Sequence, residues 1–146
     1  MRELAWNISE TAHALRRLYG RRAQSLGVTR AQWRVLKHLA LEPGLKQVEL
    51  AERMDVEPIT LCRIVDRMEE AGLVERQRDP ADRRAWRLAL TEKSGPLLDQ
   101  LRAMAEGLAA EAFDGFADDE VTALTNLLAR IRANVTAIEE NGRQSA

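Results

Sequence analysis

The chain has 146 residues, of which 45% are hydrophobic, so it suits one compact globular protein and argues against a disordered chain. The net charge of −1 does not by itself indicate a nucleic-acid partner, and the single cysteine excludes an internal disulfide and a cysteine-based zinc site. No apolar run is long enough to cross a bilayer and the first residues lack a signal-peptide pattern, so we expect a cytoplasmic protein with no membrane partner.

The first third of the sequence predicts two amphipathic helices. Apolar residues recur at intervals of three and four over about residues 2–25, and Gly27 can end that helix in the left-handed conformation. Thr29 and Gln32 then form a capping-box pattern at the start of a second helix. The Glu-Pro-Gly run at residues 42–44 ends it, because proline cannot continue the helical hydrogen bonds.

Two short helices separated by a turn are predicted next. The first covers about Lys46 to Met54, and its expected buried residues are Val48, Leu50 and Ala51. The second begins at Pro58 and has Gly72 as its expected C-terminal cap. Its apolar residues share one face, and these are Leu61, Ile64, Val65 and Met68. Thr60, Arg63 and Arg67 share the opposite face, which is what a reader of the DNA major groove requires.

From Val74 onward the pattern changes to that of a hairpin followed by two long helices. Trp86, Leu88 and Leu90 alternate with other residues, which predicts a strand with one buried face, paired with a strand over residues 74–78. Thr91 is expected to cap a helix over about residues 92–113. A last helix begins near residue 118, and its expected buried residues are Val121, Leu124, Leu127 or Leu128, Ile131, Val135 and Ile138.

Charge is distributed unevenly along the chain. Residues 1–44 carry 8 basic and 3 acidic side chains, residues 45–93 carry 10 and 11, and residues 94–146 carry 4 and 9. Because the middle segment has no excess of positive charge, binding to nucleic acid would require basic side chains gathered on one face.

The middle segment resembles the MarR family of winged-helix transcriptional regulators. The resemblance is carried by Leu50-Ala51-Glu52-Arg53, Ile64-Val65-Asp66-Arg67-Met68-Glu69, Ala71-Gly72-Leu73-Val74, Asp82-Arg83-Arg84 and Leu88-Ala89-Leu90-Thr91. The stretch from Asp82 to Lys93 is most similar to the SlyA-like branch. The resemblance implies a mainly α fold with a small β-wing, in which residues 29–91 form a winged helix-turn-helix DNA-binding domain.

The same resemblance assigns residues 1–28 and 92–146 to a helical dimerisation module. The apolar stripes of these helices are longer than the small winged unit can cover, so we expect a homodimer. The alternative is a monomer in which the three helices fold back onto residues 29–91.

Three groups of residues are expected to contact double-stranded DNA. The second short helix would face base edges through Pro58, Thr60, Arg63 and Arg67, and the guanidinium of Arg63 is best suited to a bidentate contact with guanine. The alternative is that both arginines only pair with Asp66, Glu69 or Glu70 on a solvated helix.

The wing and the helix starts supply the other two groups. In the family's Asp-x-Arg pattern, which Asp82 and Arg84 match, the aspartate orients an arginine that enters the minor groove. Four further arginines are expected to contact phosphates or support the wing, and these are Arg76, Arg78, Arg83 and Arg87. Lys46 or Gln47, together with helix-start amides, would hold phosphates.

These expectations describe a repressor that binds a pseudo-palindromic operator with half-sites about 10 bp apart. The resemblance implies a small aromatic carboxylate or phenolic effector, bound between the dimerisation module and the winged helix, that releases the DNA. The residues expected to line this pocket are Ala12, Leu15, Arg16, Tyr19, Trp33, Leu36 and His38. A tryptophan on an apolar helix face is more often plain core, which is the alternative interpretation of Trp33.

The sequence contains no catalytic motif, and we expect no enzyme, no cofactor and no metal site. His13 and His38 are isolated in the sequence. Cys62 has two interpretations, a redox switch on the DNA-reading helix or an inert cysteine. The alternative function is a winged-helix protein-interaction module without specific DNA binding. The charge balance of residues 45–93 favours that alternative, and Arg83 and Arg84 at the wing tip oppose it.

Overall fold

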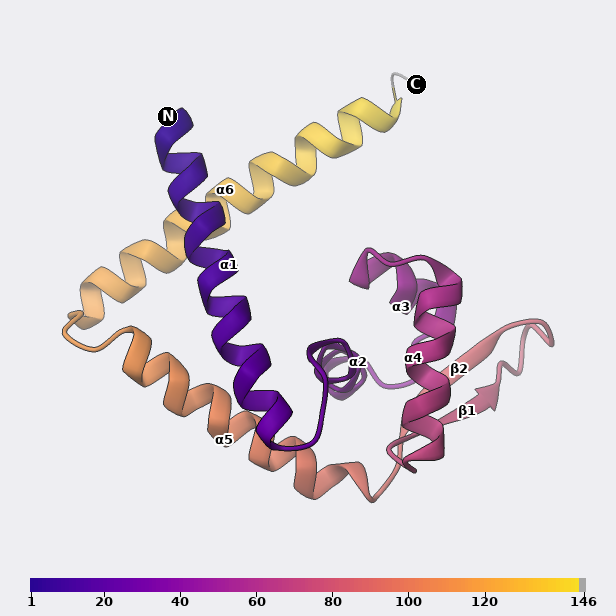
Figure 1. Cartoon of the computed structure of the whole chain (residues 1–146). Coiled ribbons are helices and arrows are strands. Elements are labelled where there is room, and N and C mark those ends of the chain that lie inside the picture. Colours follow the sequence, from indigo (N-terminus) through magenta and orange to yellow (C-terminus); the bar gives the residue numbers. More distant parts are fainter. Residues whose placement is uncertain (145–146) are drawn as a thin grey trace. The chain divides into compact units, whose positions relative to one another are not determined.

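The computed structural model describes residues 1–144, and the chain divides into two compact units, residues 1–108 and the residues from 109 onward. The elements are α1 (Arg2–Ser25), α2 (Arg30–Leu41), α3 (Gln47–Met54), α4 (Pro58–Glu70), β1 (Val74–Arg78), β2 (Trp86–Leu90), α5 (Ser94–Ala112) and α6 (Asp118–Gln144) (Figure 1). The predicted fold class, mainly α with a small β-wing, is confirmed. None of the described helices is both long and apolar enough to span a bilayer.

Local sequence signals set the boundaries of the first two helices. Gly27 has φ +80° directly after α1, as predicted for a residue that ends a helix. Thr29 forms the predicted capping box: its hydroxyl accepts the amide of Gln32 at 3.2 Å, and the side-chain oxygen of Gln32 accepts the amide of Thr29 at 2.8 Å. Val35, Leu36 and Leu39 of α2 are fully buried, so α2 runs through the core of the first unit.

Helices α3 and α4 form a helix-turn-helix pair. Asp55 turns the chain in the left-handed conformation at φ 50°, and Pro58 occupies the first turn of α4 as predicted. The core residues from this pair are Leu50, Ala51, Met54, Leu61, Val65 and Met68. The predicted burial of Val48 is wrong. Its side chain is 53% exposed, because the inward face of this eight-residue helix falls on Leu50 and Met54.

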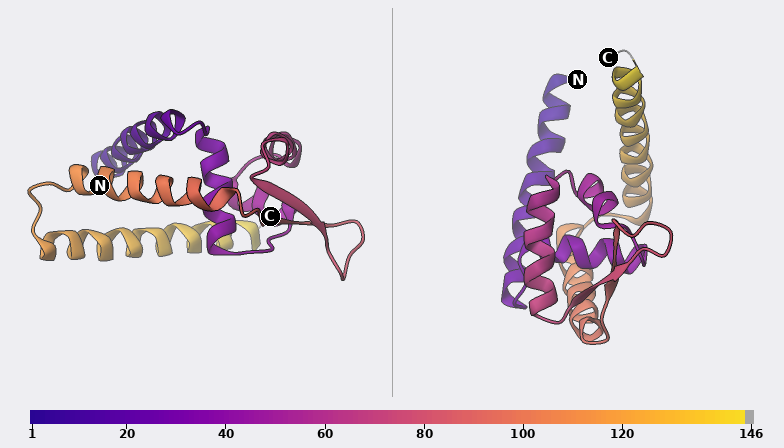
Figure 2. Two further views of the ribbon diagram at one scale, coloured as in Figure 1. Left: turned by 90° about the horizontal axis from the view of Figure 1, so that it is seen from below. Right: turned by 90° about the vertical axis from the view of Figure 1, so that its right-hand side faces the viewer.

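The wing is an antiparallel hairpin that projects away from the helices of its unit (Figure 2). Its register pairs Val74 with Leu90 and Arg78 with Trp86. Leu88 anchors it: the side chain is fully buried, and the amide donates to the carbonyl of Leu45 at 2.9 Å. The predicted burial of Trp86 is wrong, because this residue lies beyond the core, near the tip, and is 39% exposed.

The last two helices differ from the sequence prediction in two respects, the residue at which α5 begins and the burial of the apolar residues of α6. Helix α5 begins at Ser94 rather than at residue 92, and Thr91 is not its side-chain cap. The Thr91 hydroxyl donates instead to the carbonyl of Gly72, which ties the start of α5 to the end of α4. The apolar residues predicted to be buried in α6 are largely exposed in the single chain, namely Leu124, Leu127, Ile131, Val135 and Ile138.

Candidate nucleic-acid interface

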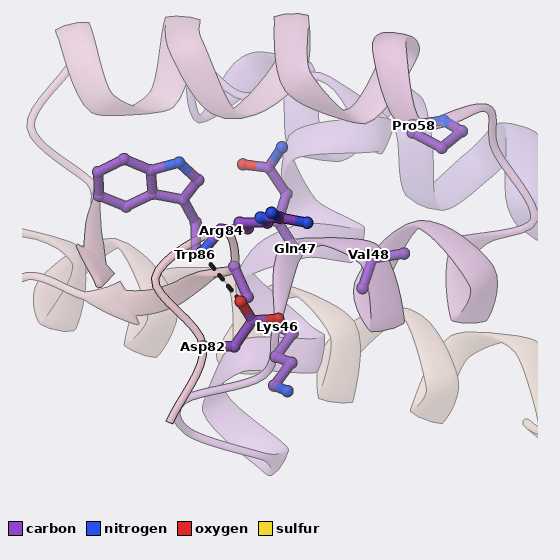
Figure 3. Close-up of a pocket in the computed structure, with 8 residues that line it drawn as sticks. Lys46, Gln47, Val48, Pro58, Asp82, Arg84 and Trp86 are labelled. Carbon is purple, nitrogen blue, oxygen red and sulfur yellow. Dashed lines mark hydrogen bonds between the residues drawn. The ribbon is translucent and has the colours of Figure 1, made fainter. Parts of the chain in front are cut away.

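A cleft of about 310 Å³ opens between the starts of α3 and α4 and the wing (Figure 3). It is lined by Lys46, Gln47, Val48, Pro58, Asp82, Arg84, Ala85 and Trp86. Helices α3 and α4 and the wing therefore present polar, cationic and apolar side chains to one opening. Five of the residues predicted for the DNA interface are brought together here: Lys46, Gln47, Pro58, Asp82 and Arg84.

The outer face of α4 carries cationic groups that have no partner within the described chain. Thr60, Arg63 and Arg67 are exposed, and neither arginine forms an ion pair or a side-chain hydrogen bond among residues 1–144. The structure therefore does not contain the alternative in which Arg63 and Arg67 pair with the acidic residues of α4. Two of those acids, Asp66 and Glu69, are bound by another arginine.

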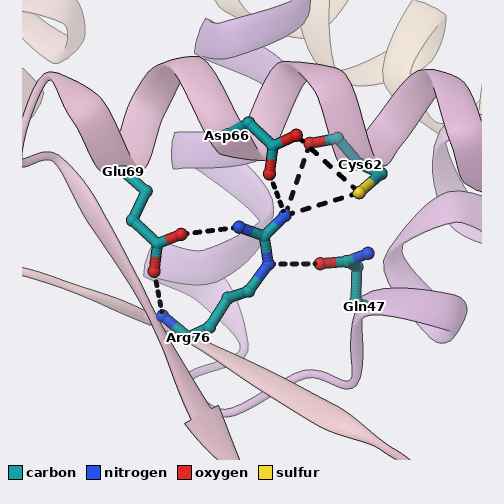
Figure 4. Close-up of polar contacts among 5 residues, drawn as sticks. All are labelled: Gln47, Cys62, Asp66, Glu69 and Arg76. Carbon is teal, nitrogen blue, oxygen red and sulfur yellow. Dashed lines mark hydrogen bonds and ion pairs between the residues drawn. The ribbon is translucent and has the colours of Figure 1, made fainter.

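That arginine is Arg76, which reaches from β1 to both short helices (Figure 4). Its Nη1 lies 2.6 Å from Glu69 Oε2, its Nη2 2.7 Å from Asp66 Oδ1, and its Nε 3.0 Å from Gln47 Oε1. The Arg76 side chain is only 15% exposed. Of the two roles predicted for Arg76, phosphate contact or wing support, this geometry favours support.

The loop of the wing is fixed where it leaves β1 by the buried carboxylate of Asp79, which is 2% exposed. Its Oδ1 accepts the amides of Ala81 at 2.7 Å and Asp82 at 3.1 Å. Its Oδ2 forms an ion pair with Arg87 Nε at 2.8 Å, without hydrogen-bond alignment, and a longer one with Lys46 Nζ at 3.6 Å. The hydrogen bond from Ala81, then that from Asp82 and the two cations, lower the pKa of Asp79 below its ordinary value, although burial opposes the shift.

Asp79 was not among the residues that the sequence predicted to form or support the interface. The signal that could have identified it is the Asp-Pro-Ala-Asp run, since an aspartate that starts a turn commonly accepts the amides two and three residues later.

At the wing tip, Arg83 and Arg84 are exposed. Asp82 Oδ1 accepts the backbone amide of Arg84 at 3.0 Å. The aspartate of the Asp-x-Arg pattern thus fixes the backbone of Arg84, and leaves its guanidinium free to project. Arg78 lies lower on the hairpin with its guanidinium 5.2 Å from the centre of the Trp86 ring.

The residues predicted to form an effector pocket do not gather around one cavity in the single chain. Tyr19 and Trp33 stack at 5.6 Å between ring centres, whereas Leu36 is in the core. His38 is half-buried, and burial followed by the charge of Arg34 lowers its pKa. Ala12 and Leu15 are half-buried on α1, and Arg16 is exposed there.

A second cavity, of about 200 Å³, lies between α2 and α5. It is lined by Trp33, Lys37, Ala40, Leu41, Leu98, Leu101, Arg102 and Ala105. Of the seven residues predicted for the effector pocket, Trp33 lines it. Within the described residues, no group of three or more His, Cys, Asp or Glu side chains is placed to hold a metal ion.

Comparison with known proteins identifies this arrangement. A model of the MarR family matches residues 26–85. The crystal structure of the transcriptional regulator PA3341 is 34% identical, covers 92% of this chain and 98% of that chain, and superposes with a TM-score of 0.81. The chain belongs to the MarR family.

Other MarR structures agree over nearly the whole chain. A MarR transcriptional regulator from Methanosarcina mazei Go1 has 27% identity and a TM-score of 0.85, and the match covers 94% of this chain and 99% of that one. A cysteine-to-serine mutant of MarR from E. coli, complexed with operator DNA, has 28% identity and a TM-score of 0.77 over 88% of this chain and 93% of that one. The predicted family of winged-helix transcriptional regulators is thereby confirmed.

Proposed function

We propose that this MarR-family protein is a homodimeric repressor that binds a pseudo-palindromic operator, with α4 in the major groove and the wing arginine in the minor groove. The observation that carries the proposal is a set of exposed cations without internal partners. Arg63 on the outer face of α4 and Arg84 on the wing are exposed and form no ion pair within residues 1–144, while Asp66 and Glu69 of α4 are bound by Arg76.

Each predicted contact receives a role from its place in the fold. Arg63 reads guanine and Pro58 and Thr60 face neighbouring base edges, because the first turns of a recognition helix lie closest to the bases. Arg84 enters the minor groove, since Asp82 holds its backbone and leaves the guanidinium free.

The remaining polar side chains contact phosphates or hold the wing and the short helices in position. Arg83 and Arg78 are exposed on the hairpin, and Arg67 lies one turn beyond Arg63 on α4. Gln47 lies at the first position of α3, where the amides of the helix start favour anions. Its side-chain oxygen also accepts a hydrogen bond from the Nε of Arg76. Arg76 and Asp82 act by positioning other groups, and we assign them no direct contact with DNA.

We assign dimerisation to residues 1–28 and 92–146. The support is the apolar stripe of α6, a 27-residue helix whose large apolar side chains are exposed in the single chain. Sedimentation velocity at micromolar concentration is expected to give a dimer. A stable monomer under those conditions would contradict this assignment.

The test of DNA binding is fluorescence anisotropy with DNA from immediately upstream of the protein's own gene, with scrambled DNA as control, at several salt concentrations. We expect selective binding whose affinity falls steeply with salt, as counterions are released from phosphates. No binding even at low salt would favour the alternative of a protein-interaction module. Repression itself is tested with a reporter gene placed behind the bound site, which is expected to be more active when the regulator is deleted.

We further propose membership of the SlyA-like branch, on the motif from Asp82 to Lys93, and release of DNA by a small aromatic carboxylate or phenol. The support for the effector is the cavity between α2 and α5, where the Trp33 ring and the cations Lys37 and Arg102 meet an apolar wall. Calorimetry with salicylate-like acids is expected to give binding heat that Trp33→Ala removes. An absence of heat, with DNA affinity unchanged by the acids, would contradict the effector proposal.

A further inference from the structure

Two large apolar side chains are exposed at the starts of the two short helices. Ile59 is 63% exposed at the second position of α4, and Val48 is 53% exposed at the second position of α3. Val48 lines the cleft, as does Pro58, the neighbour of Ile59 (Figure 3). Val48 therefore lies in the cleft beside Arg84, and Ile59 lies four residues before Arg63 on α4.

Helix formation gives no reason for an isoleucine at this position. A β-branched side chain loses rotamer freedom in a helix, so its helix propensity is lower than that of leucine or glutamate. Ile59 also contributes nothing to the buried core, which α4 completes with Leu61, Val65 and Met68. An exposed β-branched residue beside unpaired arginines therefore points to a contact outside the chain.

The position of Ile59 relative to Arg63 defines what such a contact would meet. Residues four apart lie on one helix face and are separated by about 6 Å along the axis, which corresponds to roughly two base steps of 3.4 Å. In the major groove, thymine is the base that presents a methyl group, and apolar side chains discriminate it by packing against that group.

We infer that Ile59 packs on the C5-methyl group of a thymine within about two base pairs of the guanine read by Arg63, and that Val48 extends this apolar surface. The inference rests on the proposed function and adds an operator feature to it: an A·T pair with a defined strand orientation in each half-site. Arg63 alone specifies the neighbouring G·C pair and cannot impose this second preference.

The test removes the methyl group alone. An operator is first obtained by repeated selection of random duplexes with the purified full-length protein, and each thymine is then replaced in turn by deoxyuridine. We expect one position in each half-site where the replacement weakens wild-type binding about fourfold, the effect of losing one buried methyl group. The other replacements are expected to change affinity little.

Protein variants then identify the side chain that contacts the methyl group. Ile59→Ala should bind the thymine operator more weakly and should no longer distinguish thymine from uracil at that position. Ile59→Val, which keeps an apolar branch, should retain part of the discrimination. Glu70→Ala is the control, because Glu70 is an exposed side chain at the opposite end of the same helix and outside the cleft, and this variant should keep the wild-type discrimination between thymine and uracil. Thermal unfolding of each variant verifies that it is folded.

The outcomes separate this inference from the proposed function. If selection yields a defined operator but no thymine-to-uracil replacement affects binding, the methyl contact is wrong and the regulator remains. If the uracil penalty persists unchanged in Ile59→Ala, another side chain reads the methyl group and the assignment to Ile59 is overturned. If selection yields no preferred sequence at all, both the inference and sequence-specific regulation are wrong.

Discussion

Helix α4 and strand β1 lie against each other and use arginine in opposite ways. On β1, Arg76 is 15% exposed and is held by Asp66, Glu69 and Gln47. On α4, Arg63 and Arg67 are exposed and have no partner within the described chain. The guanidinium of Arg76 thus binds two carboxylates of the helix, which leaves Arg63 and Arg67 without partners among the described residues.

The difference shows why net charge is a poor guide to this surface. Residues 45–93 carry one more acidic than basic side chain. Asp66 and Glu69 of α4 are bound by Arg76, and Asp79 at the start of the wing loop is bound by Arg87 and Lys46. This pairing uses three acids and three cations, so it leaves the sum unchanged. What distinguishes the surface is the position of the arginines without internal partners, which are exposed on α4 and at the wing tip, and a partner would meet that local charge rather than the sum.

The largest expected effect comes from removing a free arginine of α4. Arg63→Ala should lower the preference for the operator over a site with the guanine replaced by about 10- to 100-fold, because a bidentate base contact is lost. Non-specific binding should change much less. Competition anisotropy with both duplexes measures this, and Arg67→Ala on the same face is the matched comparison. An equal loss of preference in the two variants would contradict the special role of Arg63.

Removing the bound arginine should instead act on stability. Arg76→Ala leaves the carboxylates of Asp66 and Glu69 without their cation, and we expect the free energy of unfolding to fall by about 1–2 kcal/mol. Urea denaturation measures the change, and Arg67→Ala, which loses no internal partner, should stay within about 0.5 kcal/mol of wild type. Equal stability of the two variants would remove the distinction between bound and free arginines.

A smaller effect on binding is expected at the wing tip. Arg84→Ala should weaken binding to all sequences by a similar factor and lower the slope of log affinity against log salt by about one unit per protomer. Arg83→Ala provides the comparison at the neighbouring position. A change in sequence preference without a change in slope would place Arg84 at a base edge rather than in the charged minor groove.

The smallest effect is a pH dependence from Asp79. Its pKa is lowered in the folded protein, so its contribution to stability is present above the ordinary carboxyl pKa of about 3.9 and is lost as the pH falls through the folded value. The difference in unfolding free energy between wild type and Asp79→Asn should therefore shrink below about pH 4. A difference that stays constant with pH would contradict the role of the carboxylate charge.

Features of the fold that depend on neighbours in sequence were predictable. The capping box of Thr29 and Gln32 and the left-handed Gly27 are set within a few residues, so the pattern alone located the first helix boundary. The prediction that Thr91 caps α5 was wrong for the opposite reason. Its hydroxyl binds the carbonyl of Gly72, a partner from another element that no local pattern reveals.

The same distinction separates the predicted site from what was missed. Exposed residues of α4 follow from helical periodicity, which placed Thr60, Arg63 and Arg67 on one outward face. Periodicity does not fix the inward face of a helix of only two turns, so Val48 was wrongly assigned to the core. The wing anchor Asp79 was missed because its cations come from β2 and from the residue before α3.

The hydrogen bond from the Leu88 amide to the Leu45 carbonyl connects the wing to the segment directly before the helix-turn-helix pair. Strand β2 is flanked by β1 on one edge and by the Leu45–Lys46 segment on the other, where Lys46 forms a bridge with Arg87. The Leu88 amide should accordingly exchange with solvent deuterium only when its whole unit unfolds, far more slowly than amides at the tip of a hairpin that frays. Any displacement of the wing would pull on the residues directly before α3, so we expect the wing and the two short helices to move together.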